Sequence, residues 1–147
     1  MPFRFPLASL LRLRQGLERQ RAAQLLEAST KAARARGELA QIDAAIVESR
    51  HADAAALRAG CSAAELQFAV LTRASLQAAR DTTEQQVKRL EAQRLTAAAD
   101  YQRAFREREI LETLSTQQRR IYQQDHSRRE QHDLDAAHLL QLWRKRG

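Results

Sequence analysis

The residues best equipped for chemistry are three histidines near the carboxyl end and a single cysteine. His126, His132 and His138 recur every six residues. Six residues turn a helix by about 240°, so the three imidazoles cannot share one metal ion. Cys61 has no basic neighbour closer in sequence than Arg58, so nothing in the sequence activates its thiol. We therefore expect no metal site and place the histidines on a solvated helix surface.

Motifs of catalysis and cofactor binding are absent from the sequence as well. It contains no Gly-rich phosphate loop, no nucleophile elbow, no C-x-x-C pair and no H-E-x-x-H. A single cysteine also excludes a disulfide within the chain, which fits a reducing compartment. We expect a protein that is not an enzyme and that needs no cofactor.

Composition predicts a helical protein without a large core. The 147 residues include 29% charged and 5% aromatic side chains, and the mean hydropathy is -0.60. Alanine supplies much of the 44% hydrophobic fraction, which suits close helix contacts better than a thick interior. Arg12 and Arg14 interrupt the first apolar run, and no segment reaches the roughly 20 apolar residues of a membrane span. We expect a soluble, cytoplasmic protein.

Helix-breaking residues divide the chain once in its interior. Proline is confined to the first six residues, and the stretch GCSAAE begins at Gly60, which can end a helix in the left-handed conformation. Ser62 and Glu65 follow with the S-x-x-E spacing of a capping box. The sequence therefore predicts an all-α fold, an antiparallel two-helix coiled-coil hairpin. Its helices cover 7–59 and 62–143, with a turn at 60–62, in a single coiled-coil domain over 1–147.

Apolar residues at seven-residue spacing predict the seam between the two helices. Folding back at the turn sets residue i opposite a residue near 122 minus i. This register sets Arg14 against Arg108. It also sets Ile42 against Arg80, so the register is open to a shift of a few residues. The first row is Leu11, Glu18, Leu25, Ala32, Leu39 and Ile46, and the second contains Ala28, Ala35 and Ile42.

The second predicted helix is longer than the first, so it overhangs the amino terminus. At about 1.5 Å per residue the helices extend roughly 80 Å and 120 Å, which leaves about 25 residues beyond Ser115. A lone helix of that length is marginally stable in water. We interpret the overhang as a docking segment rather than a frayed tail, because its apolar residues have no internal partner. These are Ile121, Tyr122, Leu134, Leu139, Leu140, Leu142 and Trp143.

Charge is distributed unevenly along the predicted hairpin. Residues 1–36 carry eight basic side chains against Glu18 and Glu27, whereas five acids outnumber two arginines over residues 38–65. Folding back would give one basic end and one slightly acidic end, as expected of a molecule with two different partners. The basic residues near the carboxyl end are Arg119, Arg120, Arg128, Arg129, Arg144, Lys145 and Arg146.

Three stretches of the sequence resemble the flagellar FliJ family, small cytoplasmic proteins of the flagellar type III export apparatus. They are the opening FRFPLASLLRLRQGLERQRAAQ, the mid-chain FREREILETL and the closing RREQHDLDAAHLLQLWRKRG. The resemblance covers essentially the whole chain, including its length and the position of its turn.

The resemblance implies a stalk-like protein with two main partners. Its paired termini would enter the ring of the flagellar export ATPase, and the rest would contact the export gate protein, in peripheral association with the inner membrane. The family is also associated with escorting export chaperones, to which no residue can be assigned. Candidate gate contacts are Phe68 and Leu71, which lie outside the predicted seam, although the tyrosines associated with this part of the family are absent. Candidate ATPase-ring contacts are Phe3, Phe5, Leu7, Leu11, Arg12, Arg14, Arg119, Arg120, Leu139, Leu142 and Trp143.

Two other classes of protein stay open. The net charge of +7 and the pI near 10.6 suggest nucleic-acid binding, but the basic residues alternate with acids and lack an aromatic stacking platform. A dimerising structural scaffold would need a continuous apolar seam, which the GCSAAE stretch interrupts. We therefore expect a monomer in isolation and no nucleic-acid partner.

Overall fold

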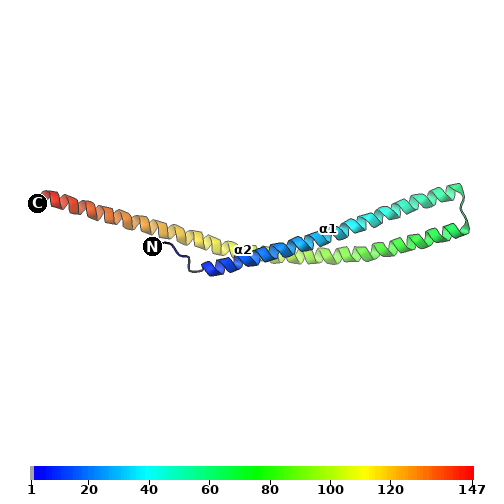
Figure 1. The fold of residues 1–147 in the computed structure, drawn as a ribbon, viewed down its shortest axis with the longest axis horizontal. Helices are drawn as coiled ribbons and strands as arrows, with labels where there is room; N and C mark the ends of the chain where they lie inside the picture. The colour runs from blue at the N-terminus through cyan, green and yellow to red at the C-terminus, as the bar shows by residue number, and fades with distance from the viewer. Residues whose placement is uncertain (1) are drawn as a thin grey trace. The chain divides into compact units, whose positions relative to one another are not determined.

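The computed structural model describes residues 2–147, which form two long α-helices (Figure 1). Helix α1 spans Ala8–Ala59 and helix α2 spans Ala63–Arg146, and residues 2–147 contain no strand. The helices pack against each other, which confirms the predicted all-α two-helix hairpin with a longer second helix. Compared with the predicted bounds, α1 begins at Ala8 instead of residue 7 and α2 continues to Arg146 instead of 143.

The chain forms two compact units, and each unit contains a part of both helices. The terminal unit comprises the residues up to Arg19 together with Arg103–Gly147, and the turn unit comprises Gln20–Gln102. The single domain expected from the sequence stays a prediction.

The turn between the helices has the local structure that its sequence predicts. Gly60 has a φ of +84°, in the left-handed region that ends α1. The Ser62 N–H donates to Glu65 Oε2 at 2.8 Å, and the Glu65 N–H donates to Ser62 Oγ at 3.2 Å. These reciprocal hydrogen bonds form a capping box, so local chemistry alone ends one helix and begins the next.

Gly60→Ala is expected to destabilise the hairpin by about 1–2 kcal/mol, because a side chain disfavours the left-handed conformation. Urea unfolding followed by the helical circular dichroism signal measures the change. Gly16→Ala and Gly37→Ala are matched controls, since both lie in α1 and an added Cβ meets nothing within 4 Å. Each should stabilise α1 by about 0.5–1 kcal/mol. Equal effects at all three positions would contradict a special role for Gly60.

Burial confirms the two predicted seam rows of α1. All nine of their residues are buried or half-buried, and Ala32, Ala35 and Ile46 have exposed fractions of only 0%, 3% and 7%. The buried residue of α2 is Ala104. The seam is thin because three of these four buried residues are alanines, so polar contacts at its margin contribute to the choice of register.

In the terminal unit, ion pairs join the two helices near the predicted contact of Arg14 with Arg108. Arg14 pairs with Glu107, the residue before Arg108. Arg108 Nε donates to Glu18 Oε2 at 2.7 Å, and its guanidinium also pairs with Glu112. The hydrogen bond from Arg108 to Glu18 raises the pKa of Arg108, and the bond to Glu112 adds to the effect. Each arginine therefore pairs with a carboxylate of the opposite helix that lies within about one turn of its predicted partner position.

In the turn unit, ion pairs also join the two helices. Arg80 Nε donates to Asp43 Oδ1 at 2.7 Å. Asp43 follows Ile42, the residue that the predicted register set against Arg80. Glu91 Oε1 lies 2.7 Å from Arg36 Nη1, and its Oε2 accepts a hydrogen bond from Arg94 Nε at 2.8 Å. This hydrogen bond, assisted by the charge of Arg36, lowers the pKa of Glu91.

Glu91→Gln is expected to lower the midpoint of thermal unfolding at pH 7. Because the pKa of Glu91 is lower in the folded chain, its contribution is complete above the ordinary value of 4.5 and is lost as pH falls through the folded value. The difference between parent and variant should therefore shrink below pH 4.5. Glu27→Gln is the control, since Glu27 is 67% exposed in its pair with Lys31 and should contribute little. A difference between parent and E91Q that stays constant down to about pH 3 would contradict the assignment.

Candidate partner-binding surfaces

The segment before α1 lies along α2 in the terminal unit (Figure 1). The Phe3 and Tyr122 rings have centroids 5.6 Å apart at 46°, and Arg119 Cζ lies 5.9 Å from the Phe3 centroid. The Tyr122 ring in turn lies 6.1 Å from that of His126. The prediction that Tyr122 has no internal partner is wrong, because residues before the first helix continue along α2.

The remainder of α2 is uncovered. Residues 123–147, called the tail from here on, are exposed at every position, so the overhang begins later than the predicted Ser115. Leu139, Leu142 and Trp143 have exposed fractions of 60%, 46% and 82%. Their spacing of three and four residues places them on one side of the helix. Three cations, Arg144, Lys145 and Arg146, form its last turn.

The candidate ATPase-ring residues fall into two groups in the terminal unit. The first group is half-buried and consists of Phe3, Phe5, Leu11 and Arg14. The guanidinium of Arg14 also forms an ion pair with Glu107. The exposed group can contact a partner without any rearrangement. It consists of Leu7, Arg12, Arg119, Arg120, Leu139, Leu142 and Trp143.

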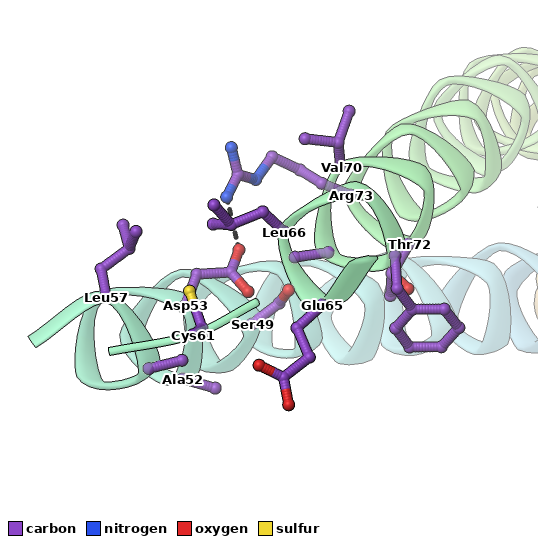
Figure 2. A pocket seen from close by; sticks show the side chains of 13 residues that line it. Ser49, Ala52, Asp53, Leu57, Cys61, Glu65, Leu66, Val70, Thr72 and Arg73 are labelled. Atoms are coloured by element: carbon purple, nitrogen blue, oxygen red, sulfur yellow. Dashed lines mark hydrogen bonds and ion pairs between the residues drawn. The ribbon is translucent and has the colours of Figure 1, made fainter. Parts of the chain in front are cut away.

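The turn unit contains an open groove of about 420 Å³ beside the turn, called the turn groove from here on (Figure 2). Of the two candidate gate residues, Phe68 lines this groove and is 73% exposed, whereas Leu71 is 63% exposed but lies outside it. Leu66, which was not among the candidates named from the sequence, also lines the groove and is 40% exposed. The apolar lining includes Leu57, Cys61, Leu66, Phe68, Ala69 and Val70.

The charged residues that line the turn groove all have partners within the chain. Arg73 of α2 pairs with Asp53 of α1 across the groove, as the dashed line in Figure 2 shows. Glu65 accepts the hydrogen bond of the Ser62 N–H in the capping box. The groove thus presents apolar surface, the Asp53–Arg73 ion pair and the carboxylate of Glu65.

The residues with potential for metal or redox chemistry are not brought together. Throughout residues 2–147, no group of three or more His, Cys, Asp or Glu side chains could hold a metal ion. His126 Nδ1 instead lies 3.4 Å from Glu130 Oε1 one turn along the same helix, and Cys61 is half-buried in the turn between the helices. Within the same described residues, no helix has the length and apolar character needed to cross a membrane.

A helical hairpin with an exposed helical tail and an apolar groove has surface features that suit contacts with other proteins. The chain belongs to the flagellar FliJ protein family, whose family model matches residues 3–147. It is therefore a flagellar export-related protein, with partners in that system, and its family is one of export components rather than of known enzymes. No curated protein and no solved structure matched the chain.

Proposed function

We propose that this chain is the stalk-like component of the flagellar type III export apparatus. Its terminal unit binds the ring of the export ATPase, and its turn unit contacts the export gate. Membership of the FliJ family supports a place in the apparatus. The observation that carries the ATPase contact is the tail, a helix exposed along its whole length that ends in Leu139, Leu142, Trp143 and three cations.

The chemistry of the tail suits insertion into a ring. Exposed leucine and tryptophan side chains on one helix side are typical anchors of a protein interface, because they bury large apolar areas on binding. The neighbouring cations would accelerate association with an acidic partner surface. The contact of Phe3 with Arg119 and Tyr122 holds the amino-terminal segment on α2, the helix that carries the tail. Residues from both ends of the chain can therefore contact the same partner.

The turn unit supplies the proposed second contact. Phe68 and Leu71 expose large apolar side chains near the turn, and such residues favour a protein partner over bulk water. A chain that joins an ATPase to a membrane-embedded gate would act on the cytoplasmic side of the inner membrane. Escort of export chaperones belongs to this proposal as a role of the whole chain, without assigned residues.

Capture by immobilised protein tests the proposal directly. The full-length chain should retain the cognate export ATPase and the cytoplasmic domain of the export gate at about 150 mM salt, where exposed charges alone are largely screened. Nucleic acid should not compete with either partner at this salt concentration. Capture of neither partner would overturn the stalk proposal.

A further inference from the structure

We propose that the tail pairs in antiparallel orientation with the tail of a second copy of this chain. The paired segment is 132–147, at the carboxyl end of α2 (Figure 1). The inference goes beyond the proposed function and does not depend on it, because it concerns this chain alone. It is supported by an apolar strip and a set of charges that complement themselves when the direction of the helix is reversed.

The apolar strip lies at the centre of the segment and consists of Ala136, Leu139, Leu140 and Trp143. Steps of three and four residues lead from Ala136 to Trp143 through either leucine, so all four lie on one side of the helix. The two leucines are 60% and 66% exposed, and Trp143 is 82% exposed. Between two antiparallel copies, Ala136 of one faces Trp143 of the other, and the leucines meet at the centre. A large side chain thus meets a small one at each end of the strip, which lets the two strips interdigitate.

Acidic and basic residues flank the strip on both sides. Asp133 and Arg144 are eleven residues apart, which is about three helical turns, so they lie on one flank. Asp135 and Arg146 have the same separation and share the other flank. The two flanks are nearly opposite, because the step from Asp133 to Asp135 turns the helix by about 200°. All four side chains are exposed, and none of them forms an ion pair within residues 2–147.

Reversal of the helix direction brings these opposite charges together. In the register set by the apolar strip, Asp133 of each copy lies near Arg144 of the other. Asp135 likewise lies near Arg146, so two-fold symmetry gives four ion pairs. A parallel pair would instead bring opposite flanks together at the same level, acids against acids and bases against bases. The helix dipole accounts for cations in the last turn, but not for the two acids three turns earlier.

The pairing should be weak and reversible, because a seam of about three turns is short for a protein interface. The monomer expected from the sequence should therefore hold only in dilute solution. Pairing would cover Leu139 and Trp143, which the proposed function assigns to the ATPase ring. One tail could not then serve a second copy and the ring at the same time.

Sedimentation equilibrium of the full-length chain tests the pairing without any other protein. At about 50 mM salt, the parent should change from monomer to dimer between about 5 and 500 µM. Trp143 is the single tryptophan of the chain, so its fluorescence reports the same step. Burial of its exposed ring should shift the emission to shorter wavelength as the protein concentration rises.

Charge reversal tests the antiparallel register. D133R/D135R should abolish dimer formation, because it sets like charges against each other on both flanks. R144D/R146D should abolish it for the same reason. An equimolar mixture of the two variants should form a heterodimer, since all four ion pairs return with their signs exchanged. The mixture should also restore the emission shift of Trp143.

R128D/R129D is the matched control for R144D/R146D. Both variants replace two arginines by aspartates in the tail, but residues 128 and 129 lie before the paired segment. The control should therefore dimerise like the parent. Every substituted residue is exposed, so all variants should keep the parent helical content by circular dichroism.

Several results would overturn the inference. A parent that stays monomeric at about 500 µM would do so. Dimers that persist in both reversed variants would place the contact outside the tail, and a mixture that stays monomeric would exclude the antiparallel register. An emission shift with phosphatidylglycerol vesicles, but never with rising protein concentration, would assign the tail to lipid instead. The export ATPase takes no part in these measurements, so none of these results contradicts the proposed function.

Discussion

Removal of residues 127–147 is expected to weaken binding to the export ATPase about a hundredfold and to leave the stability of the hairpin unchanged. The deletion removes Leu139, Leu142 and Trp143 together with the cations of the last turn. It retains Tyr122 and His126, so the ring contact that holds Phe3 persists. Stability is preserved because every deleted residue is exposed. Calorimetric titration of the ATPase and thermal unfolding of the truncated protein measure the two quantities.

Point variants show whether the apolar side of the tail or its length accounts for that loss. The double variant L139A/W143A should lose most of the affinity that the deletion loses, since hot-spot residues dominate interfaces. Leu134→Ala is the control, because Leu134 is 69% exposed but five residues before Leu139, and so on a different side of the helix. Normal ATPase binding by the truncated protein would rule out the tail as the ring contact.

Changing both Phe68 and Leu71 to alanine is expected to weaken capture of the export gate domain by about thirtyfold and to spare the ATPase. These side chains are 73% and 63% exposed, so their loss removes contact area for a partner without disturbing the seam. Both belong to the turn unit, whereas the proposed ATPase contacts belong to the terminal unit. Titrating each variant with each partner gives a crossed comparison. Equal loss of both partners in either variant would contradict two separate contacts.

The single variants divide the gate contact further. Phe68 lines the turn groove and Leu71 does not, so F68A should account for most of the loss if the gate binds in the groove. A loss caused mainly by L71A would instead place the gate contact outside the turn groove, on the part of α2 that carries Leu71. Neither F68A nor L71A changes the charge of the chain. A loss of affinity in either variant therefore reflects lost apolar contact.

The sequence by itself determined the elements of this fold whose physical basis is local. The glycine at position 60 and the S-x-x-E spacing that follows it define the turn, because a left-handed residue and a capping box need no distant partner. The seam rows of α1 were equally predictable, since the seven-residue period of Leu11 to Ile46 depends only on helix geometry. The family resemblance, carried by the two ends and the middle of the chain, is confirmed over residues 3–147.

The tertiary structure alone decided how the helices pair and which surfaces remain accessible. A thin alanine seam tolerates several registers, and the observed one lets Arg14 and Arg108 each reach a carboxylate on the opposite helix. The contact of Phe3 with Tyr122 depends on a non-helical segment whose path no periodicity predicts. The turn groove depends on the space that Ala52, Ala56 and Ala69 leave between two helices. Such features arise from side chains distant in sequence, so they become visible only when both helices are placed together.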